Sequence, residues 1–307
     1  MAAIHASSAS PSTARAERQL VTLARLVPVA LLLPSLLFLA VFFALPALGL
    51  VSYSFLTQAP DGTVGLPITI EHYRHFFGTP LYSHVLLTTL RISLCTTGVA
   101  VLLAYPVSLV MSRSAPLVRR IITMIVIAPL IVSVVVRTYG WELILGNGPT
   151  GILNWLLLAT GIAKTPVRLL YTETAVVIGS LHVFFPMMVL PLASALGKID
   201  PRLEDAARTL GAGVWRAFCR ITLPLSLPGL AVGCALVFSL TAGSFVTPAI
   251  LGGTGAQMLG MLVDQQILVI YDSPFGATVA SVLVAIVLIV NILSNRALSR
   301  REPMPAR

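Results

Sequence analysis

Charged residues are scarce in this chain of 307 residues: Asp, Glu, Lys and Arg together make up 10% of it, whereas 57% of its residues are hydrophobic. Globular water-soluble domains use about 25% charged residues. The composition therefore excludes an ordinary soluble protein with a wetted exterior, and the mean hydropathy of +0.94 agrees with this. We expect a membrane protein for which the lipid bilayer is the solvent.

Lysine is the rarest of the charged residues, with only Lys164 and Lys198 present. A phosphate-binding P-loop needs a glycine directly before the lysine and Ser or Thr directly after it. Ala163 precedes the first lysine and Ile199 follows the second, so neither fits the pattern. The chain is therefore predicted not to hydrolyse ATP itself.

Other catalytic patterns are also missing, because no carboxylate pair, nucleophile with a base or metal-spaced His/Cys cluster falls in one place. His72 and His75 lie close to Glu71, and we favour a solvated external loop over a metal site for them. We predict that the chain is not an enzyme and binds neither a metal nor a cofactor.

Cysteine occurs only three times, at Cys95, Cys219 and Cys234. The first and third fall within apolar runs, and the second falls in a segment predicted to face the cytoplasm, where thiols stay reduced. No disulfide framework is expected.

Long apolar runs are what the sequence has instead. A helix needs about 20 residues to cross about 30 Å of hydrocarbon. These runs are uniformly apolar instead of alternating, which excludes the strands of a barrel. We predict an all-α membrane protein with six spanning helices, approximately Val27 to Phe55, Val85 to Met111, Leu117 to Val136, Thr174 to Leu196, Leu225 to Leu251 and Phe275 to Ile292.

Most of the Lys and Arg residues lie in alternate segments between these runs. By the positive-inside rule those segments face the cytoplasm, which places both termini inside. We expect cytoplasmic tails at 1–25, which is predicted to be disordered, and at 299–307, with a transmembrane domain at 26–298. The net charge of +9 is dispersed along the membrane edges, so lipid is an expected partner and nucleic acid is not.

One polar segment, 198–224, joins the fourth and fifth apolar runs on the predicted cytoplasmic side. Asp200 and Pro201 predict the start of a short helix and Gly211 predicts its end. A second helix is expected to begin near Gly213 and to end before Pro224. Its apolar residues, with Leu210, either pack on the membrane domain or contact another protein, and from the pattern alone both interpretations are open.

The spacing within this segment resembles a known motif. The segment contains Asp205-Ala206-Ala207, then three residues and Gly211, then nine residues and Ile221-Thr222-Leu223-Pro224. It is similar to the EAA loop of binding-protein-dependent ABC importer permeases. The family's Glu falls on Asp205, with Glu204 directly before it, so either carboxylate is a candidate for the contact with an ATPase. The resemblance implies an ATPase-coupling role for Glu204, Asp205, Ala206, Ala207, Arg208, Gly211, Trp215, Leu223 and Pro224.

Further runs resemble the spermidine/putrescine branch of these permeases, and the resemblance covers roughly 29–292. They are RTYGW at 137–141, FVTPAILGG at 245–253 and YDSPFGA at 271–277. The resemblance implies a type I ABC importer permease in the bacterial inner membrane that imports a small polar solute. It also implies four kinds of partner: two ATPase subunits that hold ATP and Mg²⁺, a second permease chain that we expect to be homologous but different, an extracytoplasmic solute-binding protein and membrane lipid.

The solute pathway is assigned to the fifth apolar run and to the residues around the third run, by polar and aromatic character. If the solute is a polyamine, external Glu142, Glu173, Asp264 and Asp272 and aromatic Tyr171 are expected to attract it. Several polyamine permeases have an acidic residue where this chain has Ser244, so opines, other amines and small organic solutes are alternatives. The pathway candidates are Tyr139, Trp141, Glu142, Ser239, Thr241, Ser244 and Phe245.

Two residues within the runs have competing interpretations. His182 either bonds to another helix, which we favour, or lines the pathway, and Arg91 is favoured as a structural anchor over a solute contact. The alternative function is an ion-gradient-driven secondary transporter or channel. Such proteins need ionisable residues at mid-membrane, and no Asp or Glu falls well inside any of the six runs.

Overall fold

The computed structural model describes residues 31–299, and the chain divides into two compact units, residues 1–53 and 54–307. The predicted tails lie outside the described residues, apart from Ser299.

The described part of the first unit is one apolar helix of 23 residues, Leu31–Tyr53. It contains a wide π-helical turn, η1 (Ala40–Ala44), and continues as α2 (Leu45–Tyr53). Leu36, Phe42 and Leu48 are 58–68% exposed within the chain. A helix that is apolar on every side is suited to lipid contact. The first predicted span is thereby confirmed over its described residues.

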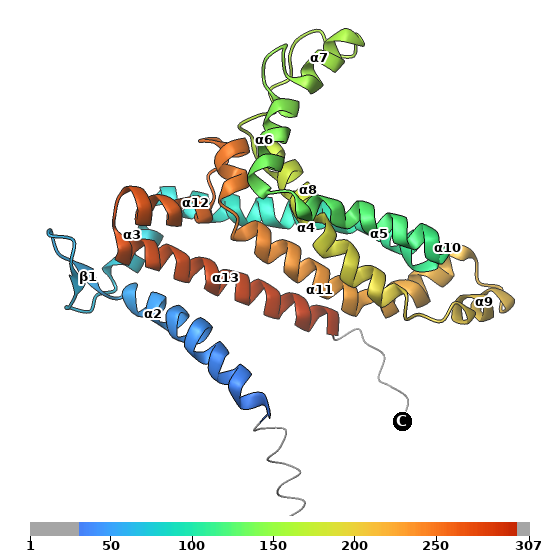
Figure 1. Ribbon diagram of the computed structural model, residues 1–307, viewed down its shortest axis with the longest axis horizontal. Coiled ribbons are helices and arrows are strands. Elements are labelled where there is room, and N and C mark those ends of the chain that lie inside the picture. The colour runs from blue at the N-terminus through green and yellow to red at the C-terminus, as the bar shows by residue number, and fades with distance from the viewer. Residues whose placement is uncertain (1–30, 300–307) are drawn as a thin grey trace, which may run out of the picture. The chain divides into compact units, whose positions relative to one another are not determined.

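The second unit is mostly helical (Figure 1). Its elements are β1 (Thr57–Gln58), β2 (Val64–Gly65), α3 (Glu71–Gly78), α4 (Pro80–Arg113), α5 (Pro116–Ile131), α6 (Val134–Leu145), α7 (Ile152–Ala159), α8 (Glu173–Leu196), α9 (Arg202–Thr209), α10 (Val214–Ala217), η2 (Phe218–Thr222), α11 (Leu223–Ala242), η3 (Pro248–Gly252), α12 (Leu259–Asp264), η4 (Gln265–Val269) and α13 (Ser273–Ser299). The two strands pair antiparallel with Thr57 opposite Gly65.

Three of the predicted spans lie within single long helices of this unit. The runs beginning at Val85, Thr174 and Phe275 fall inside α4, α8 and α13 respectively. Each of these helices is long and apolar enough to cross a bilayer. His72 and His75, expected in a loop, instead lie on the helix α3.

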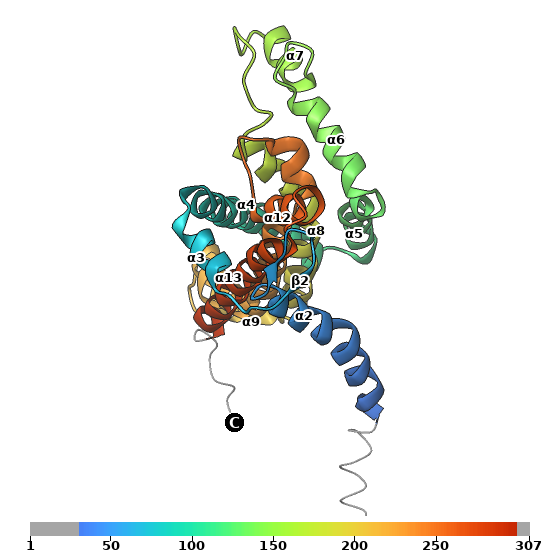
Figure 2. The same ribbon diagram turned by 90° about the vertical axis from the view of Figure 1, so that its left-hand side faces the viewer.

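The third span differs from its prediction. α5 has 16 residues and ends at Ile131, and α6 leaves it at an angle of 96°. Pro129 in the last turn has no backbone N–H, and Val132 is extended, which ends the helix. Both views show α6 and α7 leading away from the long helices (Figure 1, Figure 2). The predicted helix therefore ends at Ile131 instead of Val136, while α5 and α6 together remain long and apolar enough for one bent span.

The fifth span was also wrong at both ends. One helix runs from Val214 to Ala242 through the π turn η2, so the second helix of the 198–224 segment does not end before Pro224. Pro224 has no backbone N–H to donate within this helix, and it directly follows the wider π turn η2 and Leu223. At the other end the helix stops at Gly243, and residues 248–252 form the separate turn η3.

Close contact between α8 and α11 forms the centre of the second unit, with α4 packed on both. Ala100, Ala104, Met188, Val189 and Val237 form a buried cluster there. Glycine permits the approach, because a Cβ atom at position 229 would lie 2.7 Å from the carbonyl oxygen of Pro191. Small residues at contacts between helices are typical of proteins in lipid.

Gly229→Ala is therefore expected to lower the melting temperature of the protein purified in detergent. The added methyl group would also lie 2.4 Å from the Cβ atom of Ala195, and overpacking of this kind costs about 1–3 kcal/mol. Gly98→Ala on α4 is the matched control, because a Cβ atom there meets no heavy atom within 4 Å. Equal melting temperatures for the two variants would contradict the packing described here.

Candidate functional site

The 198–224 segment begins with the short helix α9. The Oδ1 atom of Asp200 accepts a hydrogen bond of 2.9 Å from the backbone N–H of Arg202 at the start of this helix. Gly211 follows the end of the helix with φ +83°, a conformation that suits glycine. The predicted start and end of this helix are confirmed. Figure 1 shows α9 and α10 at the end of the second unit where α4 passes into α5.

Glu204 fastens α9 to the rest of the unit. It is 8% exposed, and its Oε1 atom accepts hydrogen bonds from the Arg113 guanidinium and the Thr222 hydroxyl. Burial raises the pKa of this carboxyl, but the bonds from Thr222 and Arg113, with the charges of Arg113 and Arg208, outweigh burial and hold the pKa below its usual range. The ionised side chain of Glu204 therefore links α9 to the end of α4 and to η2 through hydrogen bonds.

Asp205, the next residue, has the opposite environment. Its side chain is 71% exposed, and its only ion pair within residues 31–299 is a 3.9 Å contact with Arg208, one turn further along α9. Ala206 is also exposed, while Ala207 is partly buried. Of the two carboxylates that the sequence left as alternatives, Asp205 is the one accessible to another protein.

Three large apolar side chains that follow α9 in the chain are exposed. Leu210 is 89% exposed, Trp215 is 76% exposed and Val214 is 69% exposed. Phe218 lies differently: its ring centroid is 5.5 Å from that of Trp215 and 5.3 Å from that of Tyr105 on α4. The packing interpretation therefore fits Phe218, but Leu210 and Trp215 have little cover from the chain itself.

The remaining two residues of the expected coupling set, Leu223 and Pro224, lie partly buried at the start of α11. They belong to the same continuous helix as Trp215. The exposed residues and the membrane span are thus parts of one element.

The pathway candidates on α6 lie beside α8. Trp141 donates a 3.0 Å hydrogen bond from Nε1 to Nδ1 of His182, so the predicted bond between His182 and another helix is confirmed. Tyr139 is 54% exposed and Glu142 is partly buried. Arg91 on α4 donates to Glu173 at the start of α8, which agrees with its role as a structural anchor.

The other four pathway candidates divide into two pairs, one on α11 and one directly after it. Ser239 accepts a 2.8 Å hydrogen bond from Asn291 on α13, and Thr241 is fully buried, so both lie within helix packing. Ser244 and Phe245 instead lie in the break between α11 and η3, and Phe245 is 48% exposed. The second pair therefore lies beyond the end of the helix.

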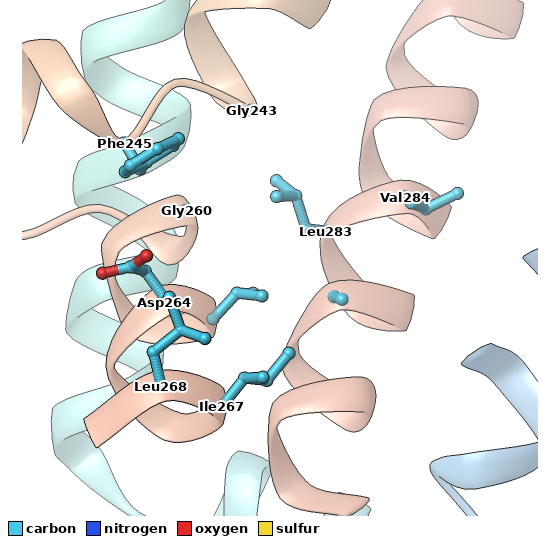
Figure 3. Close-up of a pocket in the computed structure, with 10 residues that line it drawn as sticks. Gly243, Phe245, Gly260, Asp264, Ile267, Leu268, Leu283 and Val284 are labelled. Carbon is cyan, nitrogen blue, oxygen red and sulfur yellow. The ribbon is translucent and has the colours of Figure 1, made fainter. Parts of the chain in front are cut away.

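Phe245 lines a cavity of about 380 Å³ together with Asp264, and Figure 3 shows the carboxylate on the same side of the cavity as the ring. Trp141 lines a different cavity of about 310 Å³, so the structure does not bring all the pathway candidates together. Asp264 was expected in a polar external link, but it lies in an apolar helix, Leu259–Val269. That apolar run was the sequence signal for this helix.

Sequence reasoning missed two other residues. Arg113 and Thr222 lie 91 and 18 residues from Glu204 along the chain, and no sequence pattern signals their contact. In the part of the chain that the structure describes, no three His, Cys, Asp or Glu side chains lie close enough together to hold a metal ion.

Residues 97–303 match the family described as binding-protein-dependent transport system inner membrane component. The spermidine/putrescine transport system permease protein PotB of Haemophilus influenzae is 37% identical over 265 residues, which are 85% of this chain and 92% of that protein. PotB of Escherichia coli strain K12 is 34% identical over 266 residues, which are 86% and 96% of the two chains.

Solved structures agree in fold. A bacterial ABC transporter involved in the import of the acidic polysaccharide alginate matches with a TM-score of 0.65 and 18% identity, over 92% of this chain and 99% of that chain. The MetNI methionine ABC transporter in an inward-facing conformation matches with a TM-score of 0.54 and 19% identity, over 73% and 100% of the two chains. The shared fold is that of importer permeases.

Proposed function

The chain belongs to the binding-protein-dependent transport system inner membrane components, and we propose that it carries a polyamine such as putrescine or spermidine across the inner membrane. It is a permease subunit of an ABC importer, not an enzyme, and it works with a binding protein and a separate ATPase. The polyamine assignment is supported by the relatives named above, which are spermidine/putrescine permeases.

We further propose that the 198–224 segment docks on the ATPase. The observation that carries this is the exposure of Leu210 and Trp215, at 89% and 76%, on a segment that Glu204 fastens to the membrane helices. A short helix with exposed apolar and charged residues suits a groove on another protein. Ala206 permits close approach, while Asp205 and Arg208 are available for ion pairs across the contact.

The complete assembly is proposed to contain two ATPase subunits, a second permease chain and an extracytoplasmic binding protein. When ATP closes the ATPase subunits, a helix held in their grooves moves with them and tilts the membrane helices to which it is joined. In this scheme the 198–224 segment faces the cytoplasm, as the distribution of Lys and Arg predicts.

The test is uptake by the complex reconstituted in lipid vesicles with labelled putrescine and spermidine. Uptake is expected to need the ATPase, ATP and the binding protein. Asp205→Arg is expected to reduce uptake to near background, because it places a positive charge in the contact while leaving the folded chain intact at this exposed position. Normal membrane levels of the variant, measured by immunoblot, are the control.

Two results would contradict the proposal. Uptake by the purified chain without an ATPase would favour an ion-gradient-driven secondary transporter. Wild-type uptake by the Asp205→Arg variant would show that the exposed face of α9 is not the docking surface.

A further inference from the structure

The cavity beside the break in α11 has a lining that is apolar apart from one carboxylate. Asp264 on α12 supplies the carboxylate. The apolar side chains come from α12 (Val263), η4 (Ile267 and Leu268) and α13 (Leu283 and Val284). Figure 3 shows Leu283 across the cavity from Asp264. Such a lining suits a solute with a hydrocarbon chain and a charged end.

Within the described residues, Asp264 has no polar partner. Among residues 31–299 its carboxylate makes no hydrogen bond and no ion pair, although it is partly buried and its helix is apolar. A partly buried carboxylate that no protein group compensates is stabilised by a nearby positive charge. A cation in the cavity is therefore favoured beside Asp264.

The end of α11 adds negative potential at the same place. Gly243 lines the cavity directly after the helix stops, and the carbonyl groups of a last helical turn carry a partial negative charge. Gly260 brings α12 against this end, because a Cβ atom there would lie 2.6 Å from the carbonyl oxygen of Ser244. Helix ends that stop within a membrane are suited to coordinating cations.

Phe245 provides a third feature that favours a cation. Its ring lines the same cavity and is half-exposed. The face of an aromatic ring attracts an ammonium group within about 6 Å of its centroid. The carboxylate comes from α12 and the helix end and the ring come from residues 243–245, and all three favour the same sign of charge.

We propose that Asp264, Phe245 and the carboxyl end of α11 form a subsite for one ammonium group of a diamine or polyamine during its passage through the membrane. The apolar side chains of Ile267 and Leu283 then contact the methylene chain between ammonium groups. This subsite rests on the proposed function, since it accepts a polyamine only if the importer delivers one.

Asp264→Asn in the reconstituted complex tests the subsite, with putrescine uptake and ATP hydrolysis measured on the same vesicles. Uptake at saturating binding protein and putrescine is expected to fall about tenfold, because a charge-assisted contact is lost. ATP hydrolysis is expected to stay within about twofold, since the ATPase contacts are unchanged, so fewer putrescine molecules cross per ATP. Asp264→Glu retains the charge and is expected to retain most of the uptake.

Asp61→Asn is the matched control, because it removes the same charge from an exposed carboxylate whose Oδ1 atom accepts from Thr63. Phe245→Leu is expected to reduce uptake and Phe245→Tyr to preserve it. Wild-type uptake by Asp264→Asn would overturn the subsite alone, as would an equal loss of uptake and ATP hydrolysis. A wild-type complex that imports no diamine would instead overturn the proposed function and the subsite with it.

Discussion

Gly211→Val is expected to reduce solute uptake by the assembled importer to near background. Gly211 has φ +83°, which costs about 1–2 kcal/mol for an L-residue, and a β-branched side chain is among the least tolerant. A Cβ atom at this position meets no heavy atom within 4 Å, so the effect comes from the backbone alone. The turn between α9 and α10 opens, and the exposed residues on its two sides no longer fit one groove.

Gly213→Val is the control for that experiment. Position 213 is equally open, but its φ of −66° and ψ of 160° are accessible to valine. Both variants are measured for uptake, membrane level and recovery of the ATPase on an affinity-tagged permease. If Gly211→Val retained the ATPase and wild-type uptake, the shape of this turn would have no part in docking.

Glu204→Ala is expected to destabilise the protein by about 2 kcal/mol, whereas Asp205→Ala is expected to change its stability by less than about 0.5 kcal/mol. The first substitution leaves the buried Thr222 hydroxyl and the Arg113 guanidinium without their acceptor. The second removes only a 3.9 Å contact at an exposed side chain. Thermal melting in detergent at neutral pH measures both.

The two adjacent carboxylates thereby act as controls for each other. Destabilisation of the same size in both variants would contradict the conclusion that Glu204 links α9 to other helices while Asp205 is exposed to solvent. Uptake by the Asp205 variant, normalised to its membrane level, then reports on docking without a contribution from folding.

The stabilisation by Glu204 is expected to depend on pH. Its pKa is lower in the folded protein than the ordinary value of about 4.3, so the unfolded chain binds the proton first as the pH falls. The difference in melting temperature between wild type and Glu204→Ala is therefore fully present at neutral pH. It should shrink below about pH 4.3 and vanish below the folded-state pKa. A difference that grew in acid would contradict this sign.

Uniform hydropathy predicted the helices that lie in the bilayer without interruption, such as α4 and α8, because their ends coincide with the ends of apolar runs. It failed where a helix stops inside an apolar run. No charged residue lies within four positions of Val132 or Gly243, so charge does not mark where the backbone turns. Those two breaks depend on backbone dihedral angles that hydropathy does not report.

The candidate sites show the same division. Spacing predicted the 198–224 segment and the end of its first helix at Gly211, because turn chemistry is local. The burial of Glu204 depends on Arg113, 91 residues earlier, and the cavity at Asp264 depends on the break at Gly243. Contacts between distant segments leave no pattern in the local sequence. The burial of Glu204 and the cavity at Asp264 could therefore be found only from the three-dimensional structure.

The uninterrupted helix Val214–Ala242 has a mechanical consequence. Its 29 residues, at about 1.5 Å of rise each, make a rod about 43 Å long with Trp215 near one tip and the cavity beside the other. Rotating such a lever by about 5° displaces its far tip by about 4 Å. A displacement applied at Trp215 would thus be carried along one helix as far as Ala242, three residues before Phe245.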